Sequence, residues 1–305
     1  MQATMSKADA RRLKKLKLKA ARRDQYKRFT RSKGGNFFYT LFLILFGLFS
    51  VLPMYYCIIT SFKPLDELLV FPPRFYVISP TVESYLTLPS LLDNLAVPLS
   101  RYAFNSIFIS VVTTFLHVLV GSAAAYVLSK TNIPGKKIIF TIVQMSLLYN
   151  AYTLEIPRYL IYSTLGMIDT YWAYILPMIP SSIGVFLMKQ FLDTNVPDAL
   201  IEAAKIDGAG SFKTFWRIAM PNVKPAWLTL TLFSFRDLWA IQPGGTIFSE
   251  ELKTLPFAAS TIAQSGIARQ GCAMAVTVIM MIPPILVYLI SQRSVTQTMS
   301  SSGIK

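Results

Sequence analysis

The stretch Glu202-Ala-Ala-Lys-Ile-Asp-Gly208-Ala-Gly210 is polar, helix-forming and interrupted by glycine, and it lies between two long apolar spans. Pro197 precedes it and suits the first turn of a helix, because proline lacks the N–H that would be unpaired there. Gly208 and Gly210 can adopt a positive φ and end that helix. A second short helix over Phe212–Ala219 leads back towards an apolar span. The pattern predicts a compact polar projection, and the alternative is an amphipathic helix lying among lipid headgroups.

The composition of the rest of the chain is that of a membrane protein. Of 305 residues, 53% are hydrophobic and 15% are charged, whereas soluble domains carry about 25% charged residues. A helix needs about 20 apolar residues to cross a bilayer, and only helices or closed barrels satisfy their backbone groups there. The apolar runs have helix length, so an all-α membrane protein is predicted. Six membrane-spanning helices are expected, at Phe37–Thr60, Tyr102–Leu128, Lys137–Ile156, Trp172–Phe191, Ala226–Ala240 and Cys272–Ile290.

The net charge of +15 is concentrated at the N-terminus. Thirteen Lys or Arg residues lie between Lys7 and Lys33, against two acidic residues, and this basic run directly precedes the first span. Positive residues beside a span stay in the cytoplasm and are attracted to anionic lipid headgroups. We therefore expect a retained cytoplasmic N-terminus, a cytoplasmic C-terminus after six spans, and contact with membrane lipids rather than nucleic acid.

These expectations divide the chain into three parts. Residues 1–36 form a basic cytoplasmic tail, residues 37–290 the six-helix transmembrane domain, and residues 291–305 a cytoplasmic C-terminal tail. The connection that contains the projection, about residues 193–224, carries lysine and arginine and is expected on the inside. Two outer loops, which carry acidic residues, are expected at about residues 61–100 and 241–270.

Several short motifs in a fixed order accompany the projection. They are Asn105-Ser106, Ala124-Ala125-Tyr126, Pro134-Gly135-Lys136, Ile156-Pro157, Leu165-Gly166-Met167-Ile168-Asp169-Thr170, Phe235-Arg236-Asp237-Leu238-Trp239 and Leu255-Pro256. With the projection, this order resembles the carbohydrate-type ABC importer permeases, the group that includes the maltose, multiple-sugar and heteropolysaccharide systems. The likeness covers about residues 37–305. The chain departs from the family pattern at Met220, where a leucine is usual before the proline.

The resemblance implies a type I ABC importer permease fold with six transmembrane helices and cytoplasmic coupling helices, in a bacterial cytoplasmic (inner) membrane. It also implies four kinds of partner: a second, usually different permease, two ATPase subunits, an extracytoplasmic solute-binding protein and a carbohydrate substrate. ATP and Mg would be used by the ATPase subunits, and this chain would bind no cofactor or metal. The residues expected to couple to the ATPase are Glu202, Ala203, Ala204, Asp207, Gly208 and Gly210. The loop at about residues 242–270 would reach towards the binding protein.

A transport pathway for sugars needs aromatic faces and hydrogen-bonding groups. Ionisable residues near the ends of spans usually face protein or water rather than lipid, and Arg158 can pair with Glu155 at helical spacing. The candidate pathway residues are Tyr149, Asn150, Tyr152, Glu155, Arg158, Trp239 and Gln242. The alternative for the aromatic members is the belt of Tyr and Trp at the membrane interface.

The sequence contains no recognisable catalytic centre. Lys213-Thr214 matches the end of a phosphate-binding loop, but Phe212 stands where that loop needs its second glycine. The only histidine, His117, lies in a predicted span without a set of ligands. An enzyme in the membrane is therefore disfavoured, and so is an ion-coupled secondary transporter, which would show inverted repeats or buried carboxylates. An ABC permease for a non-sugar solute, such as a peptide, phosphate or polyamine, remains the alternative to a carbohydrate permease.

Overall fold

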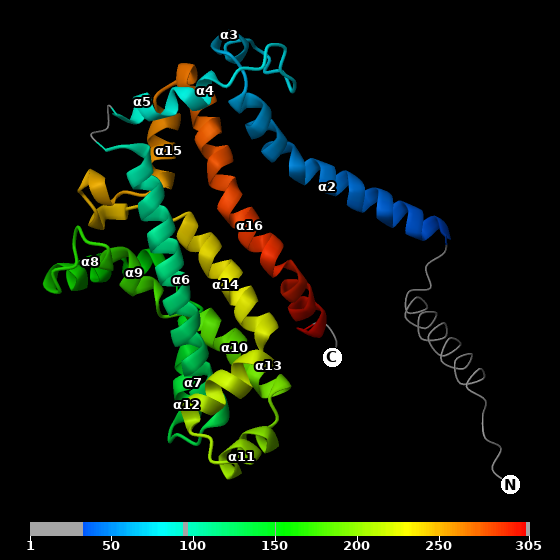
Figure 1. Cartoon of the computed structure of the whole chain (residues 1–305), viewed down its shortest axis with the longest axis vertical. Helices are drawn as coiled ribbons and strands as arrows, with labels where there is room; N and C mark the ends of the chain where they lie inside the picture. Colours follow the sequence, from blue (N-terminus) through cyan, green and yellow to red (C-terminus); the bar gives the residue numbers. More distant parts are fainter. Residues whose placement is uncertain (1–32, 94–96, 150, 303–305) are drawn as a thin grey trace. The chain divides into compact units, whose positions relative to one another are not determined.

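The structure is a computed structural model that describes residues 33–93, 97–149 and 151–302. Every regular element within those ranges is a helix (Figure 1). By its internal contacts the chain divides into two compact units, Met1–Tyr56 and Cys57–Lys305. The predicted all-α class is therefore confirmed for the described part of the chain.

The first unit contains most of helix α2 (Lys33–Ser61). Its 29 residues correspond to a length of about 43 Å, and phenylalanine, leucine and isoleucine occupy all sides of it. A helix that is apolar all round belongs in lipid or in the core of a larger assembly. Gly35–Ser61 is long and apolar enough to cross a membrane, in agreement with the first predicted span.

The second unit is a helical bundle joined by short helices. Helix α6 packs against α10 and α14, and α14 packs against α16. The α-helices of this unit after α2 are α3 (Leu65–Leu68), α4 (Glu83–Leu86), α5 (Leu88–Asp93), α6 (Leu99–Lys130), α7 (Lys136–Ser146), α8 (Glu155–Thr164), α9 (Trp172–Met178), α10 (Ser182–Asn195), α11 (Asp198–Ile206), α12 (Ser211–Thr214), α13 (Met220–Asn222), α14 (Lys224–Trp239), α15 (Leu255–Gln264) and α16 (Gln270–Ser302). The remaining turns are the 3-10 helices η1 (Ala151–Leu154), η3 (Gly244–Thr246), η4 (Glu250–Leu252) and η5 (Ile267–Arg269), and the π-helical turn η2 (Phe215–Ala219).

Among the described residues, four helical stretches are long and apolar enough to cross a membrane: Gly35–Ser61, Leu99–Lys130, Trp172–Asn195 and Ile267–Gln292. They contain the first, second, fourth and sixth predicted spans. The fourth consists of two helices, α9 and α10. The break falls at Pro180, and Ser181 starts α10 by accepting a hydrogen bond from the backbone N–H of Gly184 at 2.8 Å. The fifth predicted span corresponds to the 16-residue helix α14.

The third predicted span, Lys137–Ile156, is wrong as a single helix. Helix α7 ends at Ser146, and after η1 a new helix, α8, begins at Glu155. Pro157 explains the restart, because it lies in the first turn of α8, where a backbone N–H is not needed. Farther into a continuous helix the same proline would remove a hydrogen bond and collide with the preceding turn.

Pro283-Pro284 lies within the sixth predicted span, and α16 runs through both prolines without ending. In a regular helix the N–H of residue 284 would donate to the carbonyl of Met280, and proline has no N–H to give. The indole Nε1–H of Trp239, on α14, donates to this Met280 carbonyl at 2.9 Å instead. A side chain from the neighbouring helix thus satisfies a carbonyl that Pro284 leaves free, which is how membrane helices tolerate proline.

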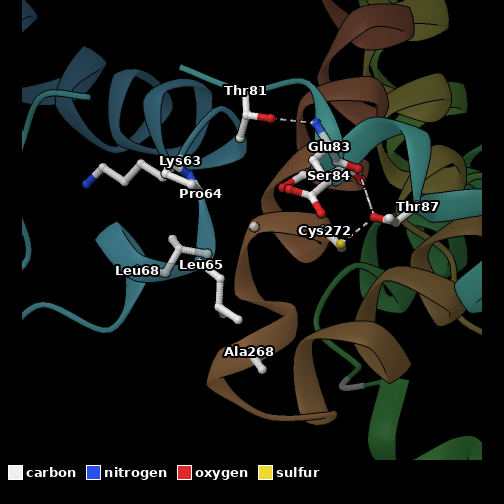
Figure 2. Close-up of a pocket in the computed structure, with 11 residues that line it drawn as sticks. Lys63, Pro64, Leu65, Leu68, Thr81, Glu83, Ser84, Thr87, Ala268 and Cys272 are labelled. Atoms are coloured by element: carbon white, nitrogen blue, oxygen red, sulfur yellow. Dashed lines mark hydrogen bonds between the residues drawn. The ribbon is translucent and has the colours of Figure 1, made fainter. Parts of the chain in front are cut away.

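A small cavity of about 160 Å³ lies between α3, α4 and the start of α16 (Figure 2). The Sγ atom of Cys272 lies 3.5 Å from the hydroxyl of Thr87, and Lys63 points away from the cavity and donates to the Arg74 carbonyl at 2.5 Å. A Cβ atom on Gly271 would lie 2.6 Å from Ser84 Oγ, so the absence of a side chain lets α16 approach α4. Cys272 is buried and packs as a small apolar residue.

Candidate functional site

The projection predicted from the sequence is a folded helical hairpin, which we define as residues 197–223. It consists of α11, α12, η2 and α13, and it lies at the end of the bundle opposite α4, α5 and α15 (Figure 1). Pro197 has an extended backbone and α11 begins at the next residue, Asp198. The short helix expected over Phe212–Ala219 is present as α12 followed by the π-helical turn η2.

One face of the projection is buried against the helices of the bundle. Ile201, on α11, belongs to one apolar cluster with residues of α6, α10 and α14, and Ala204, three residues later on the same helix, is also buried. The ring of Phe215, in η2, packs on the ring of Tyr126, in α6, with a centroid distance of 5.3 Å. The core of the projection is therefore continuous with that of the bundle.

Gly208 ends α11 in the way that the sequence predicted. Its φ is +76°, which is unfavourable for residues with a side chain. The N–H of Gly208 donates to the Lys205 carbonyl at 3.0 Å and that of Ala209 to the Ala204 carbonyl at 2.9 Å. These two bonds form a Schellman motif, which satisfies carbonyl groups at the end of the helix.

Gly210 behaves differently from the expectation of a positive φ. Its φ is −65° and its ψ is 160°, a conformation open to any residue. The Gly210 carbonyl accepts bonds from the backbone N–H and the hydroxyl of Thr214, at 3.0 and 3.1 Å. Gly210 therefore begins the second helix rather than ending the first.

The opposite face of the projection is exposed and is both acidic and apolar. Ile206 is 87% exposed and Phe212 is 79% exposed, and Glu202, Ala203 and Asp207 are exposed beside them. Glu202 forms no ion pair with any described residue. Large apolar side chains this exposed indicate a surface made for contact with another molecule. Of the six predicted coupling residues, Ala204 alone is buried, so its small side chain packs the helix inwards.

An ion pair fixes the start of the projection to the end of α6. Lys130 Nζ lies 2.8 Å from Asp198 Oδ1. The hydrogen bond and charge of Lys130, with a contribution from Lys136, lower the pKa of Asp198 below its usual value. Nearby, Asp193 of α10 accepts a bond from Ser129 at 2.5 Å and pairs with Lys189 at 2.6 Å.

At the other end of α6, the loop before α15 is held by side chains of the helix. Asn105 Nδ2 donates to the carbonyls of Glu251 and Lys253, each at 2.8 Å, and its Oδ1 accepts from the Tyr171 hydroxyl at 2.7 Å. Ser106 Oγ accepts from the N–H of Leu255 at 2.7 Å. Asn105 and Ser106 are fully buried, so a set of satisfied polar groups orients this loop.

Asp169 fixes the same loop from the side of α9. Its carboxylate accepts from the backbone N–H groups of Phe248 and Ser249, at 3.0 and 2.8 Å, and from the Ser249 hydroxyl. The bonds from Ser249, followed by that from Phe248, lower the pKa of Asp169. Asp169 also has a φ of +58°, a conformation that aspartate tolerates better than most residues.

The structure brings three of the predicted pathway residues together. Glu155, Arg158 and Gln242 line one cavity of about 500 Å³ between α8, α9 and η3. The Glu155–Arg158 ion pair that the helical spacing allows does not form within the described residues. Glu155 and Arg158 lie on one helix, α8, whereas Gln242 is more than 80 positions later in the sequence, so only the fold brings it beside them.

Two other pathway candidates, Trp239 and Tyr149, do not line this cavity. Trp239 is buried, stacks on Phe235 with a centroid distance of 5.9 Å and donates to Met280. Tyr149 is exposed. Asn150 and the side chain of Tyr152 lie outside the described part of the structure.

Sequence reasoning missed some residues that hold or line these sites. Tyr159, Tyr162 and Tyr174 line the cavity, and their presence on α8 and α9 beside the candidates was the available signal. Asp198 was also missed, although an acidic residue directly after Pro197 is typical of a helix N-terminus.

Comparison with known proteins gives a family match over most of the chain. The family model described as "Binding-protein-dependent transport system inner membrane component" matches residues 28–301. Protein LplC of Bacillus subtilis (strain 168) is 35% identical over 207 residues, which are 65% of this chain and 65% of LplC, slightly under two thirds of its length. The polygalacturonan/rhamnogalacturonan transport system permease protein YtcP of the same organism is 28% identical over 83% of this chain and 91% of YtcP.

A solved structure shares the fold. One chain in the crystal structure of a bacterial ABC transporter involved in the import of the acidic polysaccharide alginate superposes with a TM-score of 0.74 at 21% identity. The match covers 87% of this chain and 99% of that chain. It confirms the type of helical fold that the sequence motifs implied.

Proposed function

The chain belongs to the family of binding-protein-dependent transport system inner membrane components, and from that premise we propose that it carries carbohydrate across the membrane in an ATP-driven importer. As an ABC transporter permease it is a multi-pass inner membrane protein and not an enzyme. Proteins of this family act with another permease, with ATPases and with a solute-binding protein. The cargo, the arrangement of partners and the residues that couple to them form the proposal.

The proposed cargo is an oligosaccharide. The support comes from the resemblance to carbohydrate-type permeases and from YtcP, a relative named for polygalacturonan and rhamnogalacturonan transport. YtcP aligns over nearly its whole length, so the likeness includes the membrane-spanning part that would line a pathway. A peptide, phosphate or polyamine is the competing cargo.

The proposed arrangement contains one copy of this chain, a different second permease, two ATPase subunits that use ATP and Mg, and an outer binding protein. The exposed face of the projection would enter a groove of one ATPase, with Glu202 and Ala203 at the contact. Asp207 would lie at its edge, and Gly208 and Gly210 would set its shape. Closure of the ATPase pair on ATP would push the projection, and the shared core with α6, α10 and α14 would carry that movement into the membrane.

The proposed topology has six crossings and both chain ends in the cytoplasm. The segment from α7 to α8 would form the third crossing and α14 the fifth, in addition to the four long apolar stretches. Residues 1–36 and 291–305 would be cytoplasmic tails around a membrane domain of residues 37–290. The coupling loop of about residues 193–224 would lie inside, and the loops of about 61–100 and 241–270 outside.

The observation that carries this proposal is the exposed face of the projection, where Glu202 lies beside Ile206 and Phe212 on a rigid helical hairpin. The test is the substitution Glu202→Lys in the complete transporter reconstituted in liposomes. We expect loss of ATP-dependent uptake of labelled oligosaccharide and loss of ATPase co-purification, because a lysine would replace the carboxylate at the contact. Asp66→Lys, an exposed charge reversal on α3 at the far end of the unit, is the control for co-purification.

Each part of the proposal can fail separately. Uptake by the Glu202→Lys complex at the wild-type rate would show that the projection does not couple to the ATPase. Uptake of a peptide, phosphate or polyamine, with none of saccharide, by the wild-type complex would contradict the carbohydrate assignment and leave the coupling assignment intact.

A further inference from the structure

The cavity between α8, α9 and η3 has the size of a small-molecule site. Its volume is about 500 Å³, within the range of roughly 300 to 1,000 Å³ that such sites occupy. Its walls come from two helices and from a loop that follows α14. Helix α9 packs against α6, so the cavity lies beside a helix that reaches from the loop before α15 to the projection.

Three tyrosines form much of the wall of this cavity. Tyr162 and Tyr174 are buried, and Tyr159 is partly exposed. Aromatic rings present flat apolar surface, and the C–H faces of pyranose rings pack on surfaces of that kind. The hydroxyl groups of Tyr162 and Tyr174 are buried without a hydrogen-bond partner among the described residues. Because these two oxygen atoms have almost no accessible surface, Tyr162 and Tyr174 contribute ring surface to the cavity wall rather than hydrogen bonds.

Three polar side chains at the cavity have no internal partner. Within residues 33–93, 97–149 and 151–302, the side chains of Glu155, Arg158 and Gln242 form no hydrogen bond or ion pair. They offer a carboxylate that accepts, a guanidinium with five N–H donors and an amide that does both. A few polar groups around a largely apolar wall are typical of sites that fix the orientation of a ligand.

The wall that carries Gln242 is fixed before any ligand arrives. The N–H of Asp169 donates to the carbonyl of Thr246 at 2.9 Å, and Thr254 Oγ1 donates to the carbonyl of Ile241 at 2.8 Å. Asp169 also accepts from Phe248 and Ser249 on the same loop. A site whose walls are already ordered loses less conformational entropy when it binds.

We propose that this cavity is a saccharide-binding subsite that this chain contributes to the transport pathway. The inference rests on the proposed carbohydrate cargo and names the place where the cargo touches this chain. One or two pyranose units would pack on the tyrosines while Gln242 and Glu155 bind ring hydroxyls. Arg158 would bind either hydroxyl groups or the carboxylate of a uronate unit, which a guanidinium binds with two parallel hydrogen bonds.

The test measures uptake by the complete transporter in liposomes, with its binding protein, over a panel of radiolabelled neutral and uronate di- and trisaccharides. Gly245→Trp would fill the cavity at the loop, and Gly245→Ala is the matched control, because a Cβ there meets no atom within 4 Å. We expect Gly245→Trp to lower uptake at least about tenfold and Gly245→Ala to stay within about twofold of wild type.

Arg158→Gln provides a second, smaller change. It should raise KM for cargo roughly tenfold, the equivalent of one or two lost hydrogen bonds, with a much smaller change in the maximal rate of uptake. A larger rise for the uronate panel would identify a carboxylate partner, and an equal rise in both panels would identify hydroxyl partners. Either result supports the subsite, whereas a merely structural role would lower the maximal rate of uptake without raising KM.

The inference and the proposed function have separate failures. If the wild-type complex takes up saccharide and both Gly245→Trp and Arg158→Gln keep the wild-type KM and maximal rate, the subsite is wrong and the carbohydrate function stands. If the wild-type complex takes up none of the panel, the carbohydrate function fails and the subsite fails with it.

Discussion

Lys130, the last residue of α6, and Asp198, the first residue of α11, form an ion pair with an Nζ–Oδ1 distance of 2.8 Å. The Lys130 side chain is only 5% exposed, whereas that of Asp198 is 79% exposed. The carboxylate also lies at the N-terminus of α11, where the helix dipole favours a negative charge. Asp198 therefore compensates the charge of the nearly buried Lys130 side chain at the end of α6, and it also stabilises the first turn of α11.

The first prediction concerns Asp198→Asn. The change removes the charge that compensates Lys130, and we expect it to destabilise the purified protein by no more than about 1 kcal/mol, because the exposed carboxylate is screened by water and salt. The measurement is the midpoint of thermal unfolding in detergent at neutral pH. Asp207→Asn, an exposed carboxylate without an ion pair among the described residues, is the control and should leave the midpoint unchanged.

The difference in unfolding midpoint between wild type and Asp198→Asn should depend on pH, because the pKa of Asp198 is lowered in the folded protein. A carboxyl whose pKa is lower in the folded state stabilises the fold above its unfolded pKa, near 3.8, and that contribution is lost as the pH falls through the folded pKa. The difference in unfolding midpoint between wild type and Asp198→Asn should therefore be constant around neutral pH and should disappear below about pH 4. If this difference in midpoint instead grew in acid, the ion pair between Lys130 and Asp198 would not be its cause.

The second prediction compares the two glycines of the projection. Gly208→Ala must place a side chain at a φ of +76°, which costs about 1 to 2 kcal/mol. Gly210→Ala places it at a φ of −65°, and no atom lies within 4 Å of either new Cβ. We therefore expect a lower unfolding midpoint and lower uptake for Gly208→Ala only. Equal effects of the two substitutions would show that the turn tolerates either backbone conformation.

The projection could be predicted from the sequence because its signals are local. Pro197 marks the start of a helix and Gly208 marks its end, and each acts through the backbone of its own neighbours. Long apolar runs such as that of α6 are equally direct, because crossing a bilayer requires a length that can be counted. The order of the short motifs, which resembles that of carbohydrate-type ABC importer permeases, then predicts the fold of the whole membrane domain.

Features that depend on contacts distant in the sequence could not be predicted. Pro284 reads as a break in the sequence, but Trp239 on another helix satisfies the carbonyl that it leaves free. Glu155, Arg158 and Gln242 could each be chosen as polar residues near the ends of spans. Their meeting in one cavity depends on where α8 and the loop after α14 pack, and neither position is encoded in a local pattern.

The third prediction tests the bond between Trp239 and Met280. Trp239→Phe keeps the aromatic stack on Phe235 but leaves the Met280 carbonyl without a donor, at a cost of about 1 to 3 kcal/mol. Pro284→Ala supplies a backbone N–H for the same carbonyl. The double variant should therefore be more stable than the sum of the two single changes predicts, by about 1 kcal/mol.

The measurement is a double-mutant cycle of unfolding midpoints in detergent. Trp172→Phe, a change at a tryptophan that is 57% exposed and has no hydrogen-bond partner among the described residues, controls for the loss of an indole. Strict additivity of Trp239→Phe and Pro284→Ala would show that the indole does not replace the missing N–H.

The fourth prediction concerns Asn105, which holds the loop before α15. Asn105→Asp keeps the shape of the side chain and its bond with Tyr171, but it places an acceptor against the carbonyls of Glu251 and Lys253. The two buried carbonyl oxygens then face a carboxylate oxygen, and no N–H group remains to donate a hydrogen bond to them. We expect this change to destabilise the folded protein by about 2 kcal/mol or more. Because two of the bonds that orient residues 250–255 are lost, the loop should open locally before the bundle unfolds.

Limited trypsin digestion in detergent, read at the bond after Lys253, measures this local opening. Cleavage there should be much faster in Asn105→Asp than in wild type, while the bundle remains folded by circular dichroism. Asn195→Asp is the matched control, since Asn195 is exposed at the end of α10 and donates a single bond to the Phe191 carbonyl. If both variants are cleaved at the wild-type rate, the side chain of Asn105 does not hold the loop, and the bonds from Asp169 and Ser106 must be sufficient to fix it.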